Sequence, residues 1–412
     1  MAEPQVAYFT YRHQPLKALY IVYAALVLFV VRTPYWVITN LLPAWRPRRS
    51  WPLSRVLKVN TIREVLRIAF QTSIGIFLAD SEQLAKSAAE VGFVWIEPDP
   101  TLIGGEIKAA AKINDVEPAR IGGVWYGQRG PDGRVGQQAG PDEKVIYELH
   151  GGGWVIGNAT RSWDSAYMCD EMIKYADGYA RALQIEYRLA QAAPFPAKNG
   201  FPAALIDAIT GYNYLVNVVG FKPANILVSG ESAGGALAFA LTRYLVQSRL
   251  PTLSPPGALF LLSPTSDLGR TYFGAGSSVE KNDDSDYVQW FLKGYGVRAL
   301  LGNMPLEEAF TNSWISPAGA RVPRVEGQFA GMPPTLIMAG GAEYTLDEQK
   351  VLRDRLVEDN GRDAVAYVEL PDTTHIVLTE AWHEPERTQG YEAFAQWVSK
   401  VNSDVKSAEY LA

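Results

Sequence analysis

Short apolar runs alternate with longer segments of helical periodicity from about Val116 onward. The runs are rich in β-branched and aromatic residues and are bounded by glycine, proline or polar turns, which is typical of strands. Strands that alternate with crossover helices predict an α/β fold with a mostly parallel central sheet flanked by helices, beginning near Val116. We expect strands at 121–126, 144–149, 180–185, 226–229, 258–262, 335–338 and 366–369, and helices at 159–175, 201–219, 233–247, 347–360 and 389–405.

Two parts of the chain depart from this alternation. The segment at about 266–325 mixes glycine, serine and aspartate with scattered aromatic residues, which indicates an insertion between strands. The first 115 residues are helix-rich and precede the predicted sheet. We therefore expect an apolar N-terminal segment at 1–50, a helical cap region at 51–115, and a main domain at 116–412 that carries a cap insertion at about 266–325.

The N-terminal segment contains the most apolar run of the chain, at 18–31, and a second aromatic patch that ends near Trp45. A helix that spans a bilayer needs about 20 apolar residues, and the first run is shorter than that. The flanking aromatic and arginine residues favour membrane association through residues 16–45, either spanning or at the interface. The alternative is a pair of short amphipathic helices that pack on the protein's own apolar surface.

Composition excludes several classes of function. The chain has 412 residues and is 48% hydrophobic, so it can bury a large core. Its net charge of −6 and the absence of a dense basic block beyond the N-terminal region argue against a nucleic-acid partner. A single cysteine, Cys169, excludes an internal disulfide, and no cysteine or histidine cluster has zinc spacing. We expect neither a metal nor a cofactor.

The clearest chemical motif is Gly-Glu-Ser-Ala-Gly-Gly at 230–235, which follows a predicted strand and precedes a predicted helix. A serine on a tight strand-to-helix turn needs small neighbours two positions away on each side, and its hydroxyl then projects at the helix N-terminus. This context predicts that Ser232 is a nucleophile and that Glu231 supports it.

A second glycine-rich turn, His-Gly-Gly-Gly-Trp at 150–154, follows the predicted strand at 144–149. Successive glycines allow backbone amides to turn inward, where they can donate to an oxyanion. His150 and Trp154 flank these glycines and are expected to support the turn. We expect the oxyanion donors to be the amides of Gly151, Gly152, Gly153 and Ala233.

The serine also requires a general base, and the chain has four histidines. His13 precedes the predicted sheet, and His150 belongs to the glycine turn. His383 lies well beyond the last predicted strand, where we expect a solvated surface position. His375 follows the strand at 366–369 and a short loop, so we predict that His375 is the base.

The acid that orients the histidine is expected between the serine and the histidine, after the strand at 335–338. Glu343 lies on the strand-end loop and can reach across to the histidine. Asp347 lies four residues later, where a helical side chain points back along its helix. We prefer Glu343 and keep Asp347 as the alternative acid.

These residues resemble the hormone-sensitive lipase family of α/β-hydrolases, and within it the arylacetamide deacetylase and fungal steryl acetyl hydrolase branch. The two glycine motifs, the segment Tyr187-Arg188-Leu189-Ala190 and the stretch from Glu343 to Asp347 carry the resemblance, which covers about residues 116–400. The sequence departs from the family pattern where Ile376, and not glycine, follows His375. The resemblance implies an α/β-hydrolase fold, a cap built from N-terminal helices, and an N-terminal anchor with the catalytic domain in the endoplasmic reticulum lumen.

The sequence thus predicts a serine carboxylesterase or lipase that hydrolyses hydrophobic esters, such as short-chain acyl, aryl or sterol acetates, through an acyl-enzyme. Two alternatives stay open: a ligand-binding protein on the same fold, and an amidase or acyltransferase that uses the same triad. We expect a membrane-associated protein, with a soluble cytoplasmic protein as the alternative. The arginines and lysines that follow the apolar run would place that side in the cytosol, opposite to the orientation that the resemblance implies.

Overall fold

The computed structural model describes residues 7–292 and 294–409. Its centre is an eight-stranded sheet with the order β1-β2-β4-β3-β5-β6-β7-β8. Neighbouring strands from β4 to β8 are parallel, whereas β1 and β4 both pair antiparallel with β2. The strands are β1 (Phe93–Ile96), β2 (Ile121–Gly127), β3 (Lys144–Leu149), β4 (Tyr179–Glu186), β5 (Ile226–Glu231), β6 (Ala258–Leu262), β7 (Thr335–Gly340) and β8 (Val365–Leu370).

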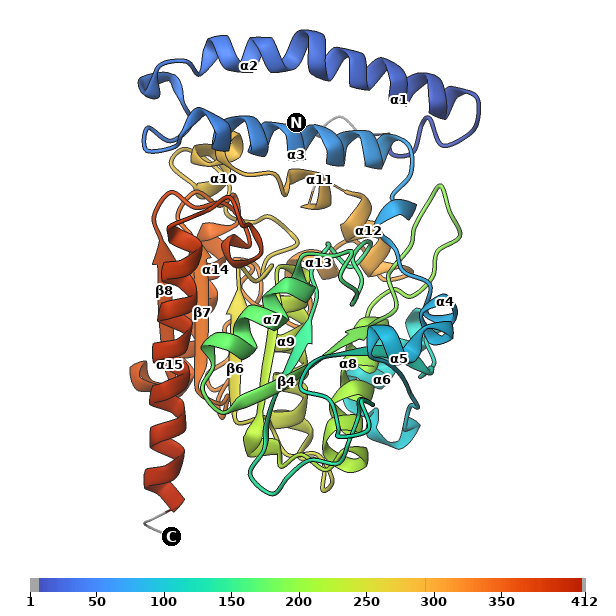
Figure 1. Cartoon of the computed structure of the whole chain (residues 1–412), viewed down its shortest axis with the longest axis vertical. Coiled ribbons are helices and arrows are strands. Elements are labelled where there is room, and N and C mark those ends of the chain that lie inside the picture. Colours follow the sequence, from blue (N-terminus) through green and yellow to red (C-terminus); the bar gives the residue numbers. More distant parts are fainter. Residues whose placement is uncertain (1–6, 293, 410–412) are drawn as a thin grey trace.

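Helices cover both faces of this sheet, which explains why its inner strands are apolar on both sides (Figure 1). Alternate residues of β3 illustrate the arrangement: Tyr147 faces the core formed with α8 and α9, whereas Ile146 faces the core formed with α7 and α15. The larger helices around the sheet are α6 (Gly105–Ile113), α7 (Ser165–Tyr175), α8 (Ala203–Asn213), α9 (Ala233–Ser248), α14 (Leu346–Asn360) and α15 (Glu386–Glu409).

All seven predicted strands are present, but the expected start of the sheet was wrong. The sheet begins at β1, well before Val116, and β1 pairs with β2 through Phe93 opposite Val124. This strand has only four residues and lies at the sheet edge, so its pattern is too short to stand out in the sequence. The helix expected at 159–175 begins only at Ser165, because residues 159–164 form turns.

The segment between β6 and β7 contains only short helices, in agreement with its irregular composition. Two further short helices, α4 and α5, precede β1. The short helices are α4 (Ser81–Lys86), α5 (Ala88–Val91), α10 (Ser278–Lys281), α11 (Gln289–Leu292), α12 (Tyr295–Leu301) and α13 (Glu308–Thr311).

The N-terminal apolar segment forms a longer helix than the expected short run. Helix α1 (Leu16–Val27) continues through a π-helical turn at Leu28–Arg32 into α2 (Thr33–Thr39). The helix widens into this π-helical turn just before Pro34. Proline has no N–H group to donate, and in a regular α-helix its ring would clash with the carbonyl four residues earlier. Within the described residues, Leu16–Thr39 is the one helical stretch long and apolar enough to cross a membrane, with a mean hydropathy of 1.9.

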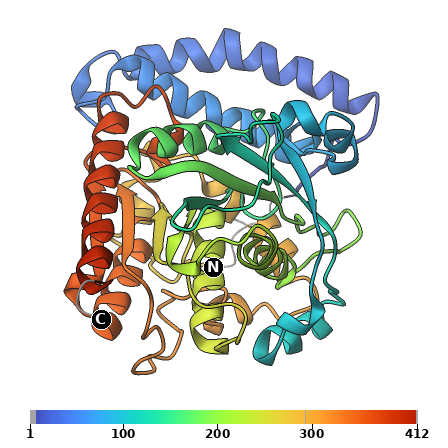
Figure 2. The same ribbon diagram turned by 60° about the horizontal axis from the view of Figure 1, so that its bottom comes forward.

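This long helix lies beside α3 (Leu53–Gln71) across one end of the molecule, as Figures 1 and 2 both show. The buried Glu64 of α3 joins the two helices through its carboxylate. It bonds Arg32 at 2.6 Å and also pairs with Arg67, whose Nη1 donates to the Tyr20 hydroxyl at 2.6 Å. The long helix is therefore fixed along α3 on one side, while most of its apolar side chains remain exposed.

Candidate active site

Ser232 occupies the turn between β5 and α9, as the sequence predicted. Its φ of 56° and ψ of −119° lie in a region that L residues rarely adopt. The neighbouring glycines are required by space: a Cβ on Gly234 would lie 1.9 Å from the Leu149 carbonyl oxygen, and one on Gly230 would lie 2.3 Å from the Gly234 carbonyl oxygen. The tight turn therefore holds the half-buried Ser232 side chain at the N-terminus of α9.

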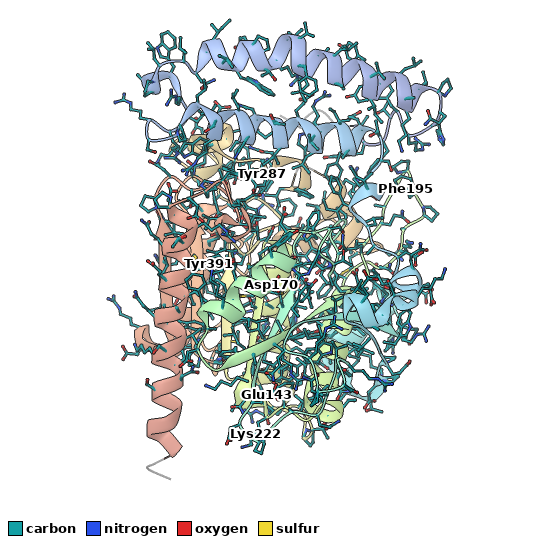
Figure 3. The ribbon with its side chains drawn as sticks, in the orientation of Figure 1. Glu143, Asp170, Phe195, Lys222, Tyr287 and Tyr391 are labelled. Carbon is teal, nitrogen blue, oxygen red and sulfur yellow. The ribbon has the colours of Figure 1, made fainter. Side chains whose placement is uncertain are left out.

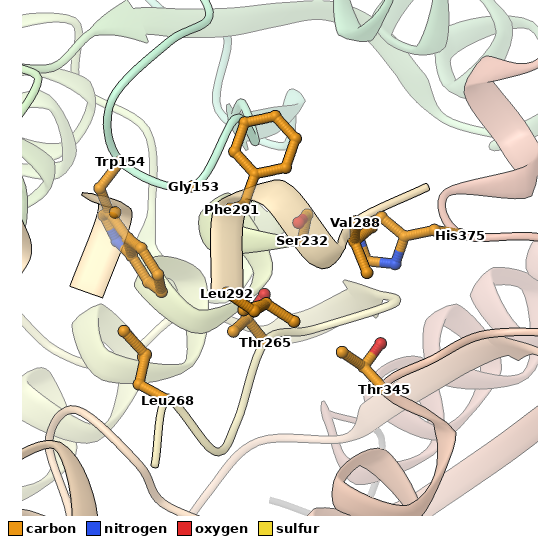
Figure 4. A pocket seen from close by; sticks show the side chains of 11 residues that line it. Gly153, Trp154, Ser232, Thr265, Leu268, Val288, Phe291, Leu292, Thr345 and His375 are labelled. Carbon is orange, nitrogen blue, oxygen red and sulfur yellow. The ribbon is translucent and has the colours of Figure 1, made fainter. Parts of the chain in front are cut away.

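His375 lies on the loop after β8 and contacts Glu343. Its Nδ1 donates to Glu343 Oε2 at 2.9 Å. Because a carboxylate can only accept, the proton sits on Nδ1 and Nε2 carries the lone pair. Within the described residues, Nε2 has no hydrogen-bond partner. Figure 4 shows the ring of His375 and the hydroxyl of Ser232 facing the same pocket.

Burial and the nearby negative charges have opposite effects on the pKa of His375. Burial alone would lower the pKa of the imidazole, but the hydrogen bond that it donates to Glu343 and the negative charge of that carboxylate raise the pKa above its ordinary value. Asp286, from the segment between β6 and β7, adds a further negative charge that raises the His375 pKa. The imidazolium form is therefore stabilised where a proton would arrive.

Of the two candidate acids, the structure brings Glu343 to His375. Asp347 instead accepts from the backbone N–H of Ser278 at 2.7 Å, so its carboxylate faces α10. Glu343 is fully buried, and its two oxygens accept from four further donors. These donors are the Ser263 hydroxyl at 2.6 Å, the Gly340 N–H at 2.5 Å, the Gln349 amide at 2.7 Å and the Thr345 hydroxyl at 3.3 Å.

The glycine turn follows β3 as predicted, but one of its expected oxyanion donors was wrong. The N–H of Gly151 donates to Glu231 Oε1 at 2.6 Å, so this amide is already engaged. Across the part of the chain that the structure describes, the amides of Gly152, Gly153 and Ala233 donate to no protein group. Glu231 thus ties the glycine turn to the serine turn through Gly151.

His150 stabilises this glycine turn through a hydrogen bond and a ring contact. Its Nδ1 donates to the Gly151 carbonyl at 2.8 Å, and its ring stacks on Tyr187 with 4.1 Å between centroids. The Tyr187 hydroxyl in turn donates to the His150 carbonyl at 2.7 Å. Burial lowers the pKa of His150 to about 4, so this histidine is neutral at physiological pH. Its place is structural, as the sequence indicated.

The expected surface position of His383 was wrong. His383 is fully buried, and its Nε2 bonds the Thr374 hydroxyl at 2.7 Å, directly before His375 in the chain. Burial, reinforced by the positive charges of Arg55 and Lys58, lowers the pKa of His383 to about 3. The N-terminal part of α3 supplies both cations, and its presence there cannot be inferred from the local sequence around His383.

Sequence reasoning also missed residues that reach the site from the segment between β6 and β7. The Tyr287 hydroxyl donates to the His375 carbonyl at 2.8 Å. Asp286 accepts from the N–H groups of Tyr344 and Tyr287 at 2.6 and 2.7 Å. Figure 3 labels Tyr287 beneath α3, where it packs against Leu66. No local motif marks these residues, because their contacts depend on how the insertion folds back.

Ser232 and His375 line two cavities of very different size. The larger cavity, of about 300 Å³, extends under α3 and is lined by Ile62, Val65 and Leu66 of that helix. The smaller cavity, of about 10 Å³, is closed by Trp154, Leu268 and Leu292 (Figure 4). Both α3 and α11 contribute walls, so these segments cover the carboxyl ends of the parallel strands.

Comparison with known proteins agrees with this fold. A model of the family described as "alpha/beta hydrolase fold" matches residues 146–379, more than half of the chain. The protein belongs to the α/β-hydrolase family. Several curated relatives are esterases, and this α/β-hydrolase is a carboxylic ester hydrolase.

Two curated relatives and one solved structure illustrate the similarity. An esterase of Acinetobacter venetianus is 29% identical over 240 residues, which are 58% of this chain and 68% of that protein. An acetyl-hydrolase of Streptomyces hygroscopicus is 27% identical over 252 residues, 61% of this chain and 73% of that protein. The structure of a hyperthermophilic esterase from Pyrobaculum calidifontis aligns with a TM-score of 0.54 at 17% identity, covering 95% of this chain and 99% of that one, and it supports the fold.

The contacts of the two candidate acids predict different losses of activity. Glu343→Gln should lower kcat on the order of 10⁴-fold, because an amide cannot stabilise the imidazolium of His375 as a carboxylate does. Asp347→Asn should leave kcat close to the wild-type value. Steady-state hydrolysis of p-nitrophenyl acetate by both variants checks this, and a larger loss in Asp347→Asn would reverse the assignment.

Proposed function

We propose that this carboxylic ester hydrolase cleaves small-acyl esters of hydrophobic alcohols through an acyl-enzyme on Ser232. One observation carries the proposal: Ser232 and His375 face one pocket, and the 2.9 Å bond from His375 Nδ1 to Glu343 leaves the lone pair of Nε2 available to take a proton. The resemblance to the arylacetamide deacetylase and steryl acetyl hydrolase branch supports aryl and sterol acetates as substrates.

In the proposed reaction, Ser232 Oγ forms a bond to the ester carbonyl carbon while His375 Nε2 takes the hydroxyl proton. The carbonyl oxygen becomes an oxyanion that accepts from the amides of Gly152, Gly153 and Ala233. His375 then gives its proton to the leaving alcohol, and the C–O bond breaks. Water, activated by the same imidazole, releases the acid and restores Ser232.

The two cavities support a division of the substrate between acyl and alcohol sides. A cavity of about 10 Å³ is close to the space that one water molecule occupies, so the smaller cavity has room for a methyl-sized group. The larger cavity reaches the volume range of small-molecule sites. An acetyl group therefore suits the small cavity, and an aryl or sterol alcohol suits the apolar space under α3.

Residues 51–115 and about 266–325 serve as a cap in this proposal. This role is supported by α3 and α11, which both line the cavities next to Ser232.

We also propose that residues 16–45 associate with a membrane. Exposed apolar side chains of this segment support this, including Leu26, Phe29 and Val30 at 60%, 70% and 69% exposure.

The contacts with α3 favour a helix that lies in the membrane interface over one that spans the bilayer. Tyr20, near the start of the helix, and Arg32, in its second half, are both bonded to α3 groups, so the helix axis follows the enzyme surface. Its exposed apolar face then enters the lipid while the large cavity lies directly behind α3. Hydrophobic esters would reach Ser232 from the bilayer side.

Replacement of the nucleophile tests the reaction itself. Ser232→Ala should abolish turnover of p-nitrophenyl acetate and labelling by a fluorophosphonate probe, because both require the hydroxyl. Intact-protein mass spectrometry of wild type with the probe should show one adduct, located on Ser232. Hydrolysis by the variant at the wild-type rate would reject the mechanism, and a wild-type protein that is not labelled would favour a ligand-binding protein.

Enlargement of the small cavity tests the assignment of the acyl side. Leu268→Ala should raise the ratio of kcat/KM for p-nitrophenyl butyrate over acetate about tenfold, because it removes a wall that a longer acyl chain meets. Leu66→Ala, which trims only the large cavity, is the matched control and should leave the ratio unchanged. The opposite pattern would place the acyl group in the large cavity.

Charge on the exposed helix face tests membrane association. The double variant Leu26→Glu with Val30→Glu should abolish flotation with phosphatidylcholine and phosphatidylserine vesicles, because each carboxylate would have to enter the apolar layer. Phe273→Glu, at another exposed apolar position, should still float. Wild-type protein that stays with the soluble fraction would instead support the soluble alternative.

A further inference from the structure

A row of buried polar residues crosses the sheet beneath the glycine turn. Strand register places Gln184 of β4, Glu148 of β3 and Ser229 of β5 side by side on one face, and all three are fully buried. Glu231 lies two residues beyond Ser229 on the same face and is also buried. Glu231 connects this row to the glycine turn, because the Gly151 backbone N–H donates to Glu231 Oε1 at 2.6 Å.

Glu148 is the unexplained member of this row. Within the described residues, neither of its carboxyl oxygens has a hydrogen-bond partner, and neither does Glu231 Oε2. The Ser229 hydroxyl next to Glu148 is directed to the sulfur of Met172 at 3.6 Å. Carboxyl oxygens of two neighbouring buried groups that lack a donor can bond each other only if one of the groups keeps a proton.

The local electrostatics agree with a shared proton. Burial, followed by the negative charge of Glu231, raises the pKa of Glu148 well above its ordinary range. Burial raises the pKa of Glu231 to about 7, although the bond from the Gly151 N–H and the neighbouring Glu148 carboxyl oppose the rise. The protonated carboxyl therefore belongs to Glu148 and the acceptor to Glu231.

The other titratable groups near the pair cannot replace this donor. Cys169 of α7 lies near both carboxyls and keeps its proton, because burial raises the thiol pKa well above the ordinary value, but within the described residues it makes no hydrogen bond to Glu148 or to Glu231 Oε2. Tyr187 lies near Glu231, but its hydroxyl donates to the His150 carbonyl. His375 also faces Glu231, with its Nδ1 proton engaged by Glu343.

We propose that Glu148 is a positioning residue for the oxyanion site: its protonated carboxyl donates to Glu231 and holds Glu231 Oε1 on the Gly151 amide. The glycine turn is thereby fixed so that the amides of Gly152 and Gly153 point toward the substrate. This inference rests on the proposed function, since it assigns Glu148 a role in the reaction at Ser232. Its effect should appear in kcat, because the oxyanion develops only in the transition state.

Two substitutions at position 148 test the donor. Glu148→Gln keeps a donor of the same shape, so kcat for p-nitrophenyl acetate should remain near the wild-type value. Glu148→Leu removes the donor and should lower kcat on the order of tenfold, with KM nearly unchanged. Thermal unfolding of both variants and active-site titration with the fluorophosphonate probe establish the folded, reactive fraction to which kcat is referred.

A double-mutant cycle with Glu231→Leu tests whether the two carboxyls act together. If Glu148 acts through Glu231, the loss caused by Glu148→Leu should largely vanish in the Glu231→Leu background. Glu186→Gln is a matched control, because the half-buried Glu186 also accepts from a backbone amide, the Ala159 N–H at 2.7 Å, and lines neither cavity beside Ser232. This control should retain the wild-type kcat.

The inference is overturned if Glu148→Leu, once folded, has the wild-type kcat, if Glu148→Gln loses as much kcat as Glu148→Leu, or if the losses at 148 and 231 are additive. None of these outcomes affects the proposed esterase reaction, which is tested separately by the activity of Ser232→Ala. A role confined to folding would lower the unfolding temperature of both variants at 148 without this difference in kcat.

Discussion

The strained turn at Ser232 is the constraint on which the rest of the site depends. Its backbone can adopt φ of 56° only because Gly230 and Gly234 leave room for neighbouring carbonyl oxygens that a Cβ would strike. The parallel strands on both sides then place their carboxyl ends, and the loops that follow them, around this turn. Strain of about 1–3 kcal/mol is maintained because the buried strands β3, β5 and β6 fix the flanking backbone.

Buried carboxyl groups surround this turn, and each is stabilised in a different way. Glu343 accepts hydrogen bonds from His375 and from several further donors. Glu231 accepts from the glycine turn, and the protonation that we infer for Glu148 removes the repulsion between the two carboxyls. An unpaired buried charge would be far more costly than any of these arrangements, so the network has little freedom to rearrange.

The N-terminal helices connect the enzyme surface to the cavity beside Ser232. One side of α3 bonds the exposed apolar helix through Glu64 and Arg67, and the other side lines the large cavity. The same helix contributes Arg55, which bonds Glu386 at 2.9 Å near the start of α15. Movement of the helix pair would therefore change both the cavity and the support of the loop that carries His375.

The sequence by itself determined the alternation of strands and helices, the serine turn and the glycine turn, because each depends on local spacing and on glycine at defined positions. It also determined the place of His375 after the last strand, because this depends only on order along the chain. It did not reveal β1, the engagement of the Gly151 amide, the burial of His383, or the contacts of Asp286 and Tyr287 with the histidine loop. It could rank Glu343 and Asp347 by direction along the chain, but only the folded insertion shows Asp347 held by α10. Those features depend on contacts between segments far apart in the chain, and such contacts form only when the sheet and its insertions pack together.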